Sequence, residues 1–248
     1  MKNTRRGIGS LGCRVVGCVL AASMLAAGGG TVAAASTDAA TATVPVNAAL
    51  VQTPAPPSLT AVESSAEDIV DFALARDRRE VVAEAARLRT TANGSAATAL
   101  GRAGVPSRKI AQLKERANRV ARVSRGGTFV GIALVANAVS ELMPGFYGRF
   151  HSRVPAAVLT LDYLDREAQL RSLARQPRNV ALAVDRLEPT WTRLRPKVVA
   201  AGGAKEAAAF GRHVAAMKRL ADGPPKQLQA QAERGLALVD ELEQVFLR

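Results

Sequence analysis

The chain has 248 residues, and its 34 Lys and Arg against 21 Asp and Glu give a formal net charge of +13. It has two cysteines and only 4% aromatic residues, which argues against a disulfide-stapled fold and against nucleic-acid recognition by stacked aromatic side chains. So basic a composition is typical of proteins attracted to anionic polymers, lipid headgroups or nucleic acid.

The first 35 residues have the pattern of an export signal. A basic start precedes an apolar stretch over 15–27, and Ala33-Ala34-Ala35 offers a small-residue cleavage site. We expect cleavage of residues 1–35 and delivery to the periplasm or the extracellular space. A retained membrane anchor is the alternative, because the stretch 15–37 carries no charge. Cleavage would remove both cysteines and leave 30 bases and 21 acids, a charge of +9, with no expected transmembrane span.

After the signal, residues 36–58 are rich in Ala, Thr, Val and Pro and predict a disordered linker. From residue 59 onward Ala, Leu, Arg and Glu dominate, which favours helices. Thr60-Ala61-Val62-Glu63 fits a capping box and predicts a helix to about Thr90, with a break at Asn93-Gly94. Gly and Pro delimit the later predicted helices. These cover 107–124, 128–142, 158–175, 177–202, 204–222 and 226–247, with a kink or a split expected at Pro189 and Pro196 and a stop at Pro144-Gly145.

The second half of the chain resembles the first. The segment Leu74-Ala75-Arg76-Asp77 returns 99 residues later as Leu173-Ala174-Arg175-Gln176, and the segment 131–135 returns at an offset of 104 as 235–239. A recurring segment of this length is a unit of architecture. We therefore predict an all-α antiparallel bundle of six to seven helices. It would form one domain, 59–248, from two degenerate three-helix repeats at about 59–145 and 155–248.

The predicted helix over 107–124 is amphipathic, with one apolar and one basic face. The basic face predicts contact with an anionic envelope component, and a merely solvated face is the alternative. Because no aromatic side chain is interleaved, we do not expect sequence-specific nucleic-acid binding. The candidate contact residues are Arg108, Lys109, Arg116, Arg119 and Arg122.

His213 and Met217 lie four residues apart and share one face of a predicted helix. Imidazole and thioether are a ligand set for copper or haem, and Met143 and His151 could complete such a site. At an offset of 100, however, His213 matches Leu113 among apolar neighbours, which favours a core histidine. We therefore predict no cofactor and keep a copper or haem carrier as the alternative.

The densest aromatic stretch, 143–151, lies at the joint between the two repeats. One interpretation is a ligand pocket or docking loop formed by Phe146, Tyr147, His151 and Trp191, because aromatic side chains are common at such sites. The interpretation that we favour is a hydrophobic plug over the end of the bundle.

Three carboxylates, Asp162, Asp165 and Glu167, cluster in the second half. Paired carboxylates can perform acid–base catalysis. Arg166 and Arg171 stand close by, however, and favour a solvated face of salt bridges. The familiar hydrolase, nucleotide and zinc motifs do not occur in the sequence, so we do not predict an enzyme.

Three segments resemble uncharacterised exported helical-bundle proteins of bacteria, over roughly 155–247. They are 161–167 (LDYLDRE), 191–196 (WTRLRP) and 213–217 (HVAAM). The resemblance implies a helical fold and an exported compartment, but no activity. The sequence thus predicts a non-enzymatic binding or interaction module of the cell envelope, whose partner could also be another envelope protein. The ligand and the oligomeric state stay open.

Overall fold

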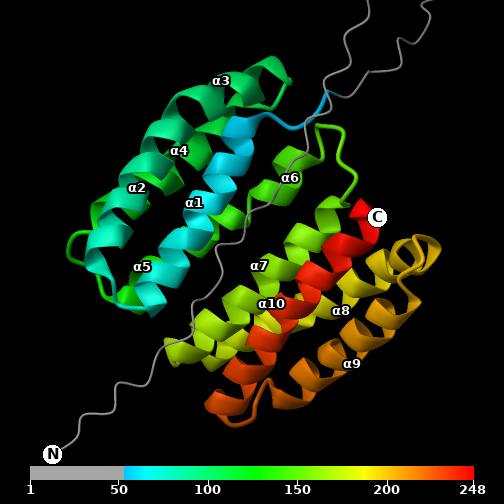
Figure 1. Cartoon of the computed structure of the whole chain (residues 1–248). Coiled ribbons are helices and arrows are strands. Elements are labelled where there is room, and N and C mark those ends of the chain that lie inside the picture. Colours follow the sequence, from blue (N-terminus) through cyan, green and yellow to red (C-terminus); the bar gives the residue numbers. More distant parts are fainter. Residues whose placement is uncertain (1–52) are drawn as a thin grey trace, which may run out of the picture. The chain divides into compact units, whose positions relative to one another are not determined.

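The computed structural model describes residues 53–248 (Figure 1). The predicted export signal and residues 36–52 of the predicted linker lie outside the described residues. Within 53–248 the chain forms ten helices and no β-strand, which confirms the all-α bundle. The helices are α1 (Pro57–Leu74), α2 (Arg78–Asn93), α3 (Ser95–Arg102), α4 (Ser107–Val123), α5 (Phe129–Ser140), α6 (Met143–Tyr147), α7 (Ala156–Leu173), α8 (Pro177–Ala200), α9 (Ala204–Leu220) and α10 (Pro225–Leu247).

The number of helices exceeds the expected six to seven because the predicted first helix is two helices, α1 and α2, and because the short helices α3 and α6 were not expected. The chain turns at Arg76, whose φ of 61° ends α1, and the Asp77 side chain accepts a hydrogen bond from the Glu80 N–H to cap α2. The predicted capping box at Thr60 and Glu63 is also wrong. Helix α1 already begins at Pro57, where a missing N–H costs nothing, and both residues lie inside it.

The prolines act differently in the two halves. Pro189 and Pro196 lie inside α8 and do not split it, since it runs for 24 residues; a kink at either one stays a prediction. Both prolines are exposed, so water can hydrate the carbonyls that their missing N–H groups leave free. Helix α5 ends at Ser140, ahead of Pro144-Gly145 as expected, and Pro144 lies in the first turn of a new short helix, α6.

The described helices form two groups (Figure 1), and each group has its own hydrophobic core. Helices α1 to α6 surround the first core and α7 to α10 the second. Helices α5 and α6 pack against α7, and Leu170 of α7 belongs to the first core, so α7 joins the halves. The largest fully buried side chains include Ile69, Leu88 and Leu113 in the first core and Phe210, Leu161 and Leu187 in the second.

The two halves share an order of packing. Helices α1 and α7 both have 18 residues and begin 99 positions apart, and α4 and α9 both have 17 and begin 97 apart. Helix α1 contacts α2 and α5, just as α7 contacts α8 and α10. The segment at Gly131 does not fit this correspondence, since it starts at the third residue of α5 and its match Gly235 is the eleventh residue of α10. Common ancestry of the halves stays a prediction.

One described segment, Phe129–Tyr147, is long and apolar enough to cross a membrane. It comprises α5 and α6, and Ile132, Ala136 and Val139 are fully buried against the rest of the first core. The central helix of a water-exposed bundle has the same composition, because it is covered on several sides.

Candidate functional site: a buried charged network on α7

The charged cluster of α7 is buried. Asp162, Asp165, Arg166 and Glu167 are at most 9% exposed, and Asp165 is fully buried. The predicted solvated face is therefore wrong, although the expected ion pairs of Arg166 and Arg171 are present. Helices α8 and α10 cover α7 within its own half, and α5 and α6 cover it from the other half.

Asp165 pairs with His213 of α9 in the interior of the second half. The imidazole Nε2 lies 2.9 and 3.0 Å from the two carboxylate oxygens, and Nδ1 lies 2.8 Å from the amide nitrogen of Gln231 on α10. The ring therefore donates from Nε2 to Asp165 and accepts at Nδ1 from Gln231. Burial raises the pKa of Asp165 to about 6, against the opposing effect of the His213 hydrogen bond.

Gly235 of α10 makes room for this pair. A Cβ at this position would lie 2.4 Å from Asp165 Oδ2 and 2.5 Å from His213 Cε1. Any side chain would therefore push α10 away from α7 and α9. The pair is enclosed: Asp165 is 0% and His213 2% exposed, so a substrate does not reach either group in this conformation.

Arg166 is the cation at the centre of the network. Its guanidinium lies 2.8 Å from Asp162 one turn earlier and 3.2 Å from Glu67 of α1. Burial lowers the pKa of Arg166, but the surrounding carboxylates, Asp162 first, outweigh it and raise the pKa above its ordinary value. The guanidinium therefore stays charged and ties α1 of the first half to α7 of the second.

Glu63 of α1 is an acid that holds its proton. The Tyr147 hydroxyl of α6 donates to Glu63 Oε2 at 2.6 Å. Burial, and then the neighbouring charge of Glu67, raise the pKa of Glu63 to about 8, although the Tyr147 hydrogen bond works in the opposite direction. At neutral pH most of this carboxyl is therefore uncharged.

Glu167 completes the network between the halves. Its carboxylate lies 2.7 Å from Arg171 Nε and accepts a hydrogen bond of 2.8 Å from the Asn137 side-chain amide of α5. The network thus connects the two halves through buried polar contacts as well as through apolar packing. Buried ionic groups of this kind require partners, and in α7 each has one.

The predicted metal ligands do not come together as one set. Met143 is buried in the first core, whereas His213 and Met217 are buried in the second. His151 is exposed, and its backbone N–H donates to the carbonyl of Thr53. Residues 53–248 hold no group of three or more His, Cys, Asp or Glu that could bind a metal ion. The copper or haem carrier stays a prediction without a preformed donor set among these residues.

The predicted aromatic pocket residues are divided between the cores in a similar way. Phe146 is buried in the first core, and Tyr147 packs against it. Trp191 belongs to the second core, where its ring lies 4.8 Å from that of Phe210. With His151 at the surface, the four residues do not line a common cavity.

Four of the five predicted anion contacts are exposed on α4: Arg108, Lys109, Arg119 and Arg122. Arg116 differs, because its guanidinium donates to the Ala138 carbonyl and pairs with Glu141 at 2.9 Å. It therefore joins α4 to α5 and is not part of a solvated basic face.

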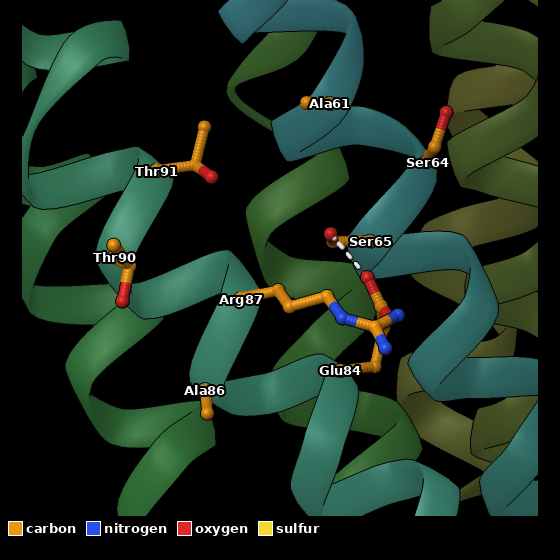
Figure 2. Close-up of a pocket in the computed structure, with 8 residues that line it drawn as sticks. All are labelled: Ala61, Ser64, Ser65, Glu84, Ala86, Arg87, Thr90 and Thr91. Carbon is orange, nitrogen blue, oxygen red and sulfur yellow. Dashed lines mark hydrogen bonds and ion pairs between the residues drawn. The ribbon is translucent and has the colours of Figure 1, made fainter.

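A shallow, open pocket lies between α1 and α2 (Figure 2). In Figure 2, Ser65 and Arg87 converge on Glu84. The Ser65 hydroxyl donates to one Glu84 oxygen, and Arg87 pairs with the other, each at 2.5 Å. This carboxylate is satisfied from within the protein, and the sequence provided no signal for the pocket.

Sequence reasoning missed the depth of the network and the partners Gln231, Gly235 and Glu67. One signal was available in α7. Its charged and apolar residues are spread evenly around the helix instead of separating into two faces. A helix without a polar face is covered on all sides when it belongs to a stable bundle.

We found no family model, curated protein or solved structure that matches this chain.

Proposed function

We propose that this protein is a non-enzymatic binding module of the cell envelope whose partner is anionic. The observation that supports this best is the separation of charges. Within residues 53–248, four carboxylates are buried, those of Glu84, Asp162, Asp165 and Glu167, but only one guanidinium, that of Arg166. The surface of the described part therefore carries a larger excess of positive charge than its full set of charged residues would give. A surface of this kind attracts polyanions and anionic membranes.

Export is part of the proposal and rests on the sequence. The basic start, the apolar stretch and the Ala-rich cleavage site of residues 1–35 support it. Cell fractionation with an epitope at the C-terminus, together with N-terminal sequencing of the exported product, tests this part. Recovery of an uncleaved chain from the cytosol would contradict it.

Duplication of a helical unit is the second part of the proposal. The equal lengths of α1 and α7 and of α4 and α9 support it. So does the turn after each first helix, where Arg76 and Arg175 both have a positive φ and the next N–H bonds the carbonyl five residues earlier. Two such halves bury their remaining apolar faces against each other, as repeated units do.

The buried contacts of His213 support a non-catalytic role. Both ring nitrogens of His213 are engaged by Asp165 and Gln231, and the pair is sealed from solvent. These groups hold helices together instead of facing a cavity. Glu63 and Asp165, two acids whose pKa values burial raises, act on stability in this proposal.

Binding of the full-length protein to anionic probes tests the proposal directly. Phosphatidylglycerol vesicles, an anionic polysaccharide and duplex DNA serve as probes, with phosphatidylcholine vesicles and a neutral dextran as controls. We expect binding to anionic probes at low salt that weakens as salt is raised, because salt screens exposed charges. No binding to any anionic probe at low salt would overturn the proposal.

A further inference from the structure

A small apolar groove lies at the end of the bundle where α1 and α7 finish. We call this the loop end, defined by the connections 75–77, 124–128 and 174–176. Leu74 of α1, Leu173 of α7 and Phe129 of α5 line the groove. Five large apolar side chains of the described residues are exposed, and two of them, Leu74 at 38% and Leu173 at 37%, lie in this one groove.

Arginines surround the groove. The segments 74–80, 122–130 and 173–180 contain seven arginines and two acids, Asp77 and Glu80. Arg78 is structural, because it donates to the carbonyls of Ser124 and Gly127 and lies over the Phe129 ring. The other six are exposed: Arg76, Arg79, Arg122, Arg125, Arg175 and Arg178.

Two of these arginines occupy positions that favour glycine. Arg76 and Arg175 follow α1 and α7 with φ of 61° and 56°, and the other positive φ values in the described residues belong to Gly104 and Gly202. A side chain is strained in this conformation, whereas glycine adopts it freely. Arginine at these two positions beside the groove is therefore less favourable for the turn than glycine would be. Backbone strain of this kind is common at functional sites.

We propose that the loop end docks on a lipid bilayer that contains anionic headgroups. This inference rests on the proposed function and adds the surface and the partner. The six arginines face the phosphates, while Leu74 and Leu173 enter the boundary between headgroups and acyl chains. The apolar centre selects a bilayer over a soluble polyanion, because a soluble polyanion offers no apolar layer to these leucines.

A double substitution separates docking from folding. In Arg76→Gly/Arg175→Gly the full-length protein should keep or raise its thermal midpoint, because glycine suits both turns. Binding to phosphatidylglycerol vesicles should fall about 30-fold, since each arginine near an anionic surface contributes about fivefold. The matched control Arg193→Gln/Arg195→Gln removes two exposed charges near the other end of α8 and should change binding less than about threefold.

A fluorescent probe locates the contact independently of these substitutions. Ala75 and Ala201 form a matched pair, because both are exposed C-cap residues that precede a residue with positive φ, at opposite ends of the bundle. With Cys13 and Cys18 replaced by serine, each is changed to cysteine and labelled with an environment-sensitive dye. Anionic vesicles should shift the emission to the blue at Ala75→Cys and leave Ala201→Cys unchanged, and phosphatidylcholine vesicles should shift neither.

The outcomes are distinct for the two proposals. If vesicles bind but the two double variants weaken binding equally, or the two dyes respond alike, the loop-end inference is overturned and the anionic partner stands. The same holds if an anionic polysaccharide binds as tightly as the vesicles, since the partner is then a soluble polymer. If no anionic probe binds, both proposals fail.

Discussion

Glu67 and Arg166 occupy the same position in two different helices and pair with each other. Each is the eleventh residue of its helix, Glu67 in α1 and Arg166 in α7, and the carboxylate and guanidinium lie 3.2 Å apart. If the halves are copies, this position has acquired opposite charges on the two sides of the contact. The pair then favours packing of the first half against the second, because two copies of the same half would place like charges opposite each other.

Loss of the Arg166 guanidinium should destabilise the protein severely. Arg166→Met leaves Asp162 and Glu67 without their shared cation, and removal of one partner of a buried pair costs about 3–5 kcal/mol. Chemical denaturation measures the difference in unfolding free energy. The control Arg186→Met removes an exposed cation 3.7 Å from Glu141 and should cost about 1 kcal/mol or less. Equal effects would contradict a structural role for the buried pair.

The two histidines should differ sharply in their contribution to stability. His213→Leu removes the donor to a fully buried carboxylate and should cost about 3 kcal/mol or more. Asp165→Asn, a neutral isostere that can still bond the ring, should cost about 1 kcal/mol. Thermal and urea unfolding give both values, and His151→Leu at the surface should stay within about 0.5 kcal/mol of the parent. A His213→Leu variant as stable as the parent would show that the pair does not hold α7 and α9 together.

Two helical glycines should respond to alanine in opposite directions. Gly235→Ala places a Cβ 2.4 Å from Asp165 Oδ2 and should destabilise by about 1–3 kcal/mol. At Gly211 in α9 the nearest atom, Trp191 Nε1, is 3.6 Å away, so Gly211→Ala should gain about 0.5–1 kcal/mol of helix propensity. Urea unfolding compares the two. Stabilisation by both substitutions would contradict the close packing of α10 on the Asp165–His213 pair.

Stability should fall as the pH rises to about 8. The pKa of Glu63 is about 8 in the folded protein against an ordinary value of 4.5, so the folded state retains a proton that the unfolded chain releases. The resulting stabilisation is fully present below pH 4.5 and is lost as the pH passes through about 8. Glu63→Gln removes this dependence and should flatten the curve of thermal midpoint against pH.

Asp165 acts with the same sign at lower pH, because its pKa is raised to about 6. The comparison between the parent and Glu63→Gln therefore belongs above pH 6. Glu115→Gln, at an exposed position of α4, should keep the slope of the parent. Parallel curves for the parent and Glu63→Gln would show that this carboxyl titrates normally in the folded protein.

The helical class and most helix boundaries were predictable from the sequence, since Gly, Pro and short polar residues act locally on backbone conformation. The predictions were wrong where tertiary contacts, and not local sequence, determine the backbone conformation. The turn at Arg76 contains no glycine, so the sequence pattern does not indicate it. Thr60 and Glu63 accept hydrogen bonds from the Tyr147 hydroxyl and do not cap a helix. Pro189 and Pro196 leave α8 intact because they face solvent.

Burial of the charged cluster could not be predicted from local pattern. Ion pairs between residues four apart, such as Asp162 with Arg166, form on exposed and buried helices alike. Whether they meet water depends on which other helices cover α7, and those helices are up to about 100 residues away in the chain. The sequence by itself determined the helices and their excess of positive charge. Only the tertiary structure decided which charges are removed from water and which are left to meet a partner, because burial is a property of packing and not of sequence neighbours.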